Sequence, residues 1–190
     1  MRGQDGEDEM SYPRVTEILQ KYFDAAGIPE CTLAAAQERG TAVHAAVAAY
    51  ALGLWAAVPE DLQGFFDSFK RWFDLYVQEV ISVEMELVNG VWQYQGHADL
   101  IAKVTGYVTA MPVIAVIDYK TPVTAKNSWR MQCAAYVEAA RKDYGAEIGG
   151  ALQLRKDGGI PKMIWVDDQN TAFAAFTGTL SGWHYNERGK

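Results

Sequence analysis

The sequence predicts an α/β fold in which a central mixed β-sheet is flanked by helices and preceded by an N-terminal helical section. One reason is a change of hydrophobic period. Apolar residues recur at helical spacing up to about residue 80, and beyond it they run or alternate as they do in strands. The other reason is the order of the expected elements, which is three helices, three strands, a helix, two strands and a closing helix. Helices in that order pack against the faces of a sheet.

The N-terminal section is expected to contain three helices. The first begins after Pro13 and carries apolar residues at helical spacing. The second covers the alanine-rich residues 31–55, with a break at Gly40 and a new N-cap at Thr41. The third, residues 59–80, opens with Pro-Glu-Asp and presents aromatic side chains at i, i+3 and i+4.

The rest of the chain is expected to form the sheet and the helices that cover it. Residues 81–88 and 91–104 are typical of strands, joined by an Asn89-Gly90 turn, and short turns make consecutive strands antiparallel neighbours. A third strand covers residues 113–121. The later elements are a helix at 128–145 that ends at Gly145, strands at 148–156 and 160–166, and a helix at 169–187.

Length and composition suit a single globular domain, expected over residues 11–190. The acidic residues 1–10 are expected to be a disordered leader, because they lack the apolar stretch of a signal peptide. No run of about 18 apolar residues is present, so neither a transmembrane helix nor a membrane partner is expected. Cys31 and Cys133 lie far apart, which argues against a zinc or iron–sulfur site and favours a reducing cytoplasm.

The distribution of charge along the chain is uneven. The net charge of −7 does not by itself suggest a nucleic-acid partner. Residues 115–162, however, hold eight Lys/Arg and five Asp/Glu, a balance of +3, whereas the remainder holds nine and nineteen, a balance of −10. The basic residues therefore gather around the third expected strand and the elements that follow it.

That third strand ends on polar residues. Asp118 and Lys120 are two positions apart, so they share one face of the strand, and Tyr119 points to the other. Taken alone, the two residues would be explained by an ion pair at a strand end. Because Asp99 lies within the preceding strand, we favour a metal site instead.

Carboxylates fall on three successive strands, at Glu86, Asp99 and Asp118. Three carboxylates brought together repel one another unless a counter-charge is present. Mg²⁺ and Mn²⁺ bind such oxygen ligands, and the backbone carbonyl of Tyr119 could supply another. Lys120 could orient a water molecule or stabilise negative charge developing on a phosphate. This pattern indicates metal-assisted hydrolysis of a phosphodiester.

Five short motifs, in their order along the chain, resemble the PD-(D/E)XK nuclease superfamily. GHAD ends at Asp99, nineteen residues before DYK begins at Asp118. RGTAVH (39–44) and QCAAY (132–136) resemble the RG-x-x-x-H and Q-x-x-x-Y motifs of the RecB-like branch. YPRVTEIL (12–19) resembles the P-S-V-T-x-I-L opening of the mitochondrial genome-maintenance exonuclease and related phage nucleases, with arginine in place of the usual serine.

The resemblance implies a restriction-endonuclease-like core and assigns roles to individual residues. Asp99 and Asp118 would be the main metal ligands, with His44 as a ligand from the helix. Lys120 would be the catalytic lysine. Glu86 matches the acidic position on the first strand, and Glu84, which has the same strand parity, is the alternative. Gln132 and Tyr136 would position the scissile strand or the lysine, and Arg39 of the RGTAVH motif is expected to bind substrate. Apart from the resemblance, Trp129 and Arg130 follow the basic Lys126 and are expected to contact a DNA strand.

The function implied by the resemblance is that of a Mg²⁺- or Mn²⁺-dependent deoxyribonuclease with one or two ions per site. Exonuclease action on single-stranded DNA or DNA ends is expected, in recombination, repair or phage replication. The location would be the cytoplasm of a bacterium or a phage-infected host, and a recombination or replication protein is a further expected partner. Two alternatives stand beside it: a structure-specific endonuclease of the same fold, and a catalytically silent DNA-binding subunit. The last is disfavoured because Asp99, Asp118 and Lys120 are all present.

Overall fold

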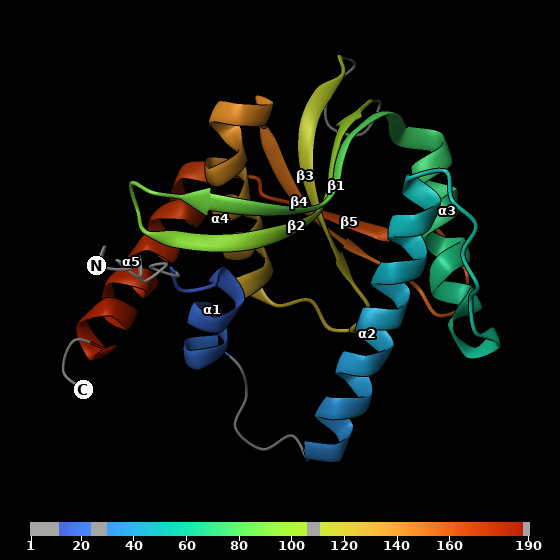
Figure 1. Ribbon diagram of the computed structural model, residues 1–190, viewed down its shortest axis with the longest axis horizontal. Coiled ribbons are helices and arrows are strands. Elements are labelled where there is room, and N and C mark those ends of the chain that lie inside the picture. The colour runs from blue at the N-terminus through green and yellow to red at the C-terminus, as the bar shows by residue number, and fades with distance from the viewer. Residues whose placement is uncertain (1–11, 24–29, 106–110, 188–190) are drawn as a thin grey trace, which may run out of the picture.

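A five-stranded mixed sheet forms the centre of the molecule, with strand order β1-β2-β3-β4-β5 (Figure 1). The computed structural model describes residues 12–23, 30–105 and 111–187, and the expected leader, residues 1–10, lies outside them. All neighbouring strands are antiparallel except β3 and β4, which are parallel. The strands are β1 (Val77–Asn89), β2 (Tyr94–Val104), β3 (Val113–Lys120), β4 (Ile148–Gln153) and β5 (Lys162–Trp165). The predicted α/β class and mixed sheet are confirmed.

Helices cover both faces of this sheet and build two large cores, beside which a smaller cluster of buried residues surrounds Trp129 and Ile164. The helices are α1 (Val15–Phe23), α2 (Glu30–Ala51), α3 (Gln63–Tyr76), which the short 3-10 helix η1 (Glu60–Leu62) precedes, α4 (Asn127–Tyr144) and α5 (Gln169–Glu187). One core contains buried residues of α1, α4 and α5, and the other contains buried residues of α2 and α3. Successive residues of β3 alternate between the two, since Val116 joins the first and Ile117 the second. Within the described part of the chain, no helix is long and apolar enough to cross a membrane.

The second helix is continuous, so the predicted break at Gly40 is wrong. α2 runs without interruption from Glu30 to Ala51. One glycine inside a helix costs about 1 kcal/mol relative to alanine, and the alanine-rich flanks outweigh that cost. Thr41 therefore lies inside the helix rather than at an N-cap. The consequence for the site is that His44 stands on a long rigid element.

The third helix ends earlier than predicted. α3 stops at Tyr76, and residues 77–80, for which the apolar spacing predicts helix, belong to β1. The N–H of Val77 still donates to the carbonyl oxygen of Phe73 as the last helical bond, while Val77 pairs with Val104 on β2. Pairing with a neighbouring strand thus overrides the helical period at this junction, as β-branched residues favour.

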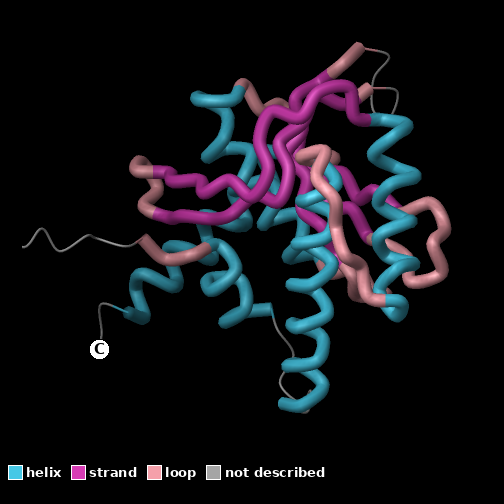
Figure 2. The backbone as a smooth tube through the Cα atoms, turned by 45° about the vertical axis from the view of Figure 1, so that its right-hand side comes forward, coloured by secondary structure: helices cyan, strands magenta, loops and turns pink. Residues whose placement is uncertain are grey.

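The predicted two-residue Asn89-Gly90 turn is also wrong. Asn89 belongs to β1 and β2 begins at Tyr94, so residues 90–93 form a four-residue loop. The Oδ1 atom of Asn89 accepts hydrogen bonds from the N–H groups of Val91 and Trp92, at 3.2 and 3.0 Å, and these bonds stabilise the wider loop. The resulting hairpin extends beyond the rest of the sheet (Figure 2), and its tip reaches α5, where the rings of Trp92 and Phe173 are 5.8 Å apart.

Candidate functional site

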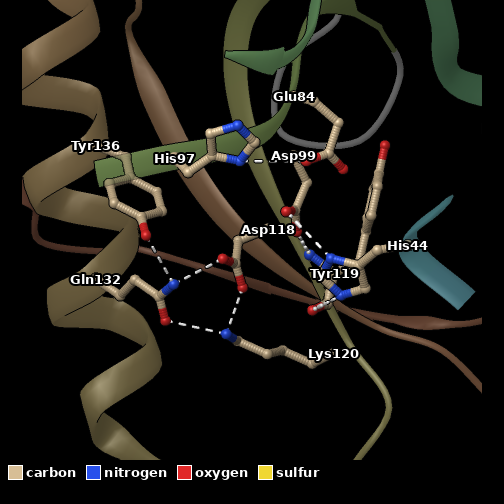
Figure 3. A network of polar contacts seen from close by, with 9 residues as sticks. All are labelled: His44, Glu84, His97, Asp99, Asp118, Tyr119, Lys120, Gln132 and Tyr136. Atoms are coloured by element: carbon tan, nitrogen blue, oxygen red, sulfur yellow. Dashed lines mark hydrogen bonds and ion pairs between the residues drawn. The ribbon is translucent and has the colours of Figure 1, made fainter. Parts of the chain in front are cut away.

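A cavity of about 740 Å³ opens where α2 and α4 meet the first three strands. Its walls come from segments that are far apart in the sequence. Strands β1, β2 and β3 and helix α2 contribute to it, and α4 contributes Gln132 and Tyr136 (left in Figure 3). Seven of the predicted site residues line it: His44, Glu86, Asp99, Asp118, Lys120, Gln132 and Tyr136.

Asp99 and Asp118 lie side by side on neighbouring strands. Leu100 of β2 pairs with Ile117 of β3, so the next residue outward on each strand is an aspartate, and the two face each other across the pair. Both are buried, with 5% and 3% of their surface exposed. The Oδ2 atom of Asp99 accepts a hydrogen bond of 2.5 Å from the backbone N–H of Tyr119. This bond fixes the carboxylate of Asp99 at the base of the cavity.

His44 projects from α2 toward the same carboxylate. Its Nδ1 atom is 3.2 Å from Oδ1 of Asp99, and its Nε2 atom is 3.1 Å from the backbone carbonyl oxygen of Tyr119 (Figure 3). The Tyr119 ring points away from the cavity and packs edge-on against Phe69 in the second core. Burial alone lowers the pKa of the His44 imidazole, but the charge of Asp99 and its hydrogen bond outweigh burial, and the pKa rises to about 9.

Lys120 and Asp118 form an ion pair in which the Nζ and Oδ2 atoms are 2.6 Å apart, with the Asp118 side chain buried and the Lys120 side chain 17% exposed. Burial lowers the pKa of the Lys120 ammonium, yet the charge of Asp118 and its hydrogen bond raise it overall. Burial raises the pKa of the Asp118 carboxyl, and Asp99 adds to that increase, while Lys120 opposes it. Lys120 is therefore held as a cation at neutral pH, with its charge directed into the cavity.

Gln132 of α4 joins this ion pair to Tyr136. Its Nε2 atom donates to Oδ1 of Asp118 at 2.7 Å and to the Tyr136 hydroxyl at 3.1 Å, while its Oε1 atom accepts from Nζ of Lys120 at 3.0 Å. Gln132 and Tyr136 are four residues apart on the helix, so both face the strands. The network holds the Lys120 side chain at a set distance from the aspartates.

Glu84, rather than Glu86, lies beside the buried aspartate. In the β1–β2 register, Val83 pairs with Leu100 and Met85 with Ala98, which places Glu84 opposite Asp99. Single ligand atoms of His44, Glu84 and Asp99 lie within 4.8 Å of one another. Glu86 stands outside this cluster, opposite His97, although it lines the same cavity.

The backbone of Glu84 is unusual for a residue within a strand. Its φ of 52° lies in the left-handed region, which non-glycine residues seldom adopt and which costs on the order of 1–3 kcal/mol. Such strain is found where surrounding structure holds a side chain in place for function. The Glu84 carboxylate also lies 3.2 Å from Nδ1 of His97, a contact that joins the two strands at the cavity.

Three residues expected to contact substrate do not line the cavity. Trp129 is only 5% exposed, packs with Cys133 and Ile164, and lines a smaller hollow next to the cavity, so its predicted contact with a DNA strand stays a prediction. Its ring instead lies 5.8 Å from Nζ of Lys120, where it shields the lysine. Arg39 lines a separate hollow, and Arg130 is half-buried on α4 outside the cavity.

Gly96 contributes to the site through the absence of a side chain. A Cβ atom placed on it would lie 2.2 Å from the Tyr136 ring. Only glycine therefore allows α4 to approach β2 closely enough for Gln132 to reach Asp118. The GHAD motif contains Gly96, but the motif alone does not reveal this role. A glycine inside an otherwise regular strand was the available signal, because it marks a close approach.

The donor atoms around the cavity fit a hard divalent cation. The cluster offers one imidazole nitrogen and the carboxylates of Glu84 and Asp99, and Asp118 stands next to Asp99. Mg²⁺ and Mn²⁺ bind carboxylate oxygen, and Mn²⁺ accepts imidazole more readily. The carbonyl oxygen of Tyr119 already faces the imidazole of His44, so it borders the same space.

Comparison with other proteins leaves the geometry as the basis for assigning a function. No model of a known protein family matches the chain, and no curated protein matches its sequence. The function is therefore inferred from the residues and their arrangement.

Proposed function

We propose that this protein is a metal-dependent deoxyribonuclease that hydrolyses DNA phosphodiester bonds. The observation that carries the proposal is the convergence of Asp99, Asp118 and Lys120 with His44 in one cavity, from three separate elements. An isolated ion pair between Asp118 and Lys120 would need neither a histidine from α2 nor a second carboxylate, Asp99, at the same place. The excess of basic residues between positions 115 and 162 also supports a polyanionic substrate.

The metal ligands of the proposed enzyme come from four side chains. His44, Glu84, Asp99 and Asp118 would hold Mg²⁺ or Mn²⁺, as one or two ions, with the Tyr119 carbonyl as a further ligand. When bound, the metal supplies Lewis-acid stabilisation of the negative charge on the phosphoryl group. The remaining polar residues of the cavity are then free to act on the substrate.

Lys120 would stabilise the charge that develops on the phosphoryl oxygens when water attacks. It is suited to this because its ammonium is partly buried and held in place by Asp118 and by Oε1 of Gln132. Preorganised cations in a partly dry site stabilise such charge without reorganising during the reaction. Gln132 is a positioning residue, which sets the direction of the Lys120 side chain through Tyr136 and the body of α4.

Exonuclease action on single-stranded DNA or DNA ends is the preferred form of this activity, because the motif resemblance favours it. Partner proteins of recombination or replication and a cytoplasmic location belong to the same proposal. An acidic molecule can bind a threaded strand within a metal-containing cavity, since the ion and Lys120 neutralise the phosphates locally.

The proposal is tested by incubating end-labelled linear single-stranded DNA and circular single-stranded DNA with the protein. Each substrate is tested with Mn²⁺, with Mg²⁺ and with EDTA, using the wild type, Asp118→Ala and Lys120→Ala. Metal-dependent loss of the linear substrate alone, abolished by either substitution, is the expected result. Cleavage of the circle would show an endonuclease. Absence of cleavage although Mn²⁺ binds would favour a silent DNA-binding subunit.

A further inference from the structure

Two further hollows lie near the cavity that contains Lys120. One, of about 320 Å³, lies at the N-terminal end of α4 against α1 and α2, and includes Gln37 and Trp129. The other, of about 730 Å³, lies between α2 and the connection from β4 to β5. We refer to the second of these as the basic hollow and define it by Arg39, Arg155, Lys156 and Lys162.

The three spaces adjoin one another around the end of β3. Lys120 and Gln132 line both the cavity and the smaller hollow. Pro122, two residues beyond Lys120, lines both the smaller hollow and the basic hollow. Residues of α2 contribute to all three, with His44 in the first and Arg39 in the last. A flexible polymer bound at Lys120 would therefore reach the basic hollow by passing over the segment from Lys120 to Pro122.

The basic hollow is positive although the whole chain carries a net charge of −7. Its four cations face two carboxylates, those of Asp61 and Asp157. Asp157 is engaged by Arg155 through two hydrogen bonds of 2.9 and 2.5 Å. Among the described residues, no carboxylate pairs with the three remaining cations, which are Arg39, Lys156 and Lys162.

The polypeptide that carries these cations is held firmly in place. The backbone N–H of Arg155 donates to Oγ of the buried Ser68 on α3 at 3.1 Å. Gly64 of α3 lies so close to the carbonyl of Lys156 that a Cβ atom on it would be 1.7 Å from that oxygen. In addition, Nε of Arg39 is buried and has no hydrogen-bond partner among the described residues. The cations therefore lie on a fixed surface. The buried Nε–H donor of Arg39 has no acceptor among the described residues.

We propose that the basic hollow binds the phosphates of a single-stranded DNA whose cleaved phosphate lies beside Lys120. The inference rests on the proposed nuclease function and adds to it the path of the strand outside the cavity. Phosphate oxygens are the acceptors that Arg39, Lys156 and Lys162 lack. Contacts of this kind are sequence-independent and depend steeply on salt.

The test compares two double variants that change the charge equally. Lys156→Glu with Lys162→Glu alters the basic hollow. Arg71→Glu with Lys142→Glu, both exposed and outside the three spaces, is the control. Binding of a fluorescent thymidine 15-mer is measured with Ca²⁺ in place of Mg²⁺, at several salt concentrations. Thermal melting checks that each variant folds.

The hollow variant is expected to bind the 15-mer at least about tenfold more weakly than the control variant. Its plot of log affinity against log salt should be shallower by roughly 0.7 for each phosphate that the variant no longer binds. Equal affinity of the two variants for the 15-mer, or no binding by the wild type, would overturn the inference.

Cleavage of the 15-mer in Mn²⁺ separates this inference from the proposed function. If the wild type binds the 15-mer through the basic hollow but cleaves nothing, the nuclease proposal fails and the binding surface stands. If the wild type cleaves the 15-mer and the two double variants bind it alike, the nuclease stands and the binding surface fails.

Discussion

Gln132 holds Asp118 by a direct hydrogen bond, in which Nε2 lies 2.7 Å from Oδ1. The other end of the same amide accepts a hydrogen bond from Lys120, so one side chain of α4 contacts both members of the ion pair. An amide is suited to this position because it donates and accepts at once. Helix α4 therefore determines how the Asp118 carboxylate and the Lys120 ammonium of β3 lie relative to each other.

Replacing Gln132 by alanine should impair catalysis more than folding. The substitution removes both hydrogen bonds to the ion pair, and Lys120 gains freedom, so we expect kcat to fall about 10- to 100-fold with a smaller change in KM. Gln169→Ala is the control, because Gln169 donates to a backbone carbonyl on α4 away from the site. Steady-state kinetics on linear single-stranded DNA measures the difference. Equal kcat values in the two variants would remove Gln132 from the positioning role.

The two glutamates of β1 should differ in their effect on metal affinity. Glu84 belongs to the cluster with His44 and Asp99, whereas Glu86 does not. We expect Glu84→Gln to weaken Mn²⁺ binding about tenfold or more, which corresponds to roughly 1.4 kcal/mol. Glu86→Gln removes the same charge from the same strand and should leave the affinity within about twofold. Isothermal titration with Mn²⁺ decides between them, and a larger loss for Glu86→Gln would reverse the assignment.

Binding of Mn²⁺ should stabilise the fold through His44. At a free metal concentration 100 times the dissociation constant, a ligand specific for the native state adds about 2.7 kcal/mol to the free energy of unfolding. For a domain of this size the melting temperature should rise by about 5–10 °C, and EDTA should reverse the increase. His44→Ala should abolish most of it, whereas His184→Ala on α5 should preserve it. A full increase in His44→Ala, measured by calorimetry, would exclude His44 as a ligand.

Two glycine-to-alanine substitutions should have opposite effects on stability. Gly96→Ala places a methyl group 2.2 Å from the Tyr136 ring, and such overpacking costs about 1–3 kcal/mol. The displaced Tyr136 should also disturb Gln132 and lower activity. Gly40→Ala meets nothing within 4 Å inside α2, so it should stabilise the protein by about 0.5–1 kcal/mol. Urea denaturation measures both changes, and a neutral Gly96→Ala would show that α4 can move away from β2.

The shared face of Asp118 and Lys120 could be predicted from sequence because side-chain direction in a strand is a local property. Alternation along one strand requires no knowledge of its neighbours. The same holds for the helical spacing of Gln132 and Tyr136. These local rules, with the order of elements, were enough to indicate an α/β fold and a carboxylate–lysine site.

The choice between Glu84 and Glu86 could not be made in this way, because both have the same parity and only the pairing register separates them. A two-residue Asn89-Gly90 turn would pair residue 88 with residue 91 and place Val80 opposite Asp99. The four-residue loop places Glu84 there instead. Loop length depends on the hydrogen bonds that Asn89 makes and on contacts at the hairpin tip, which only the folded chain brings about.

The sequence by itself thus determined which residue types share a face, and the tertiary structure decided which of them meet. His44 reaches Asp99 because α2 is continuous through Gly40, a result of helix propensity summed over the whole segment. Trp129, by contrast, is withdrawn into the core because it follows the buried face of α4. Burial and distance between remote segments are set by packing, which is non-local, and a one-dimensional pattern does not contain them.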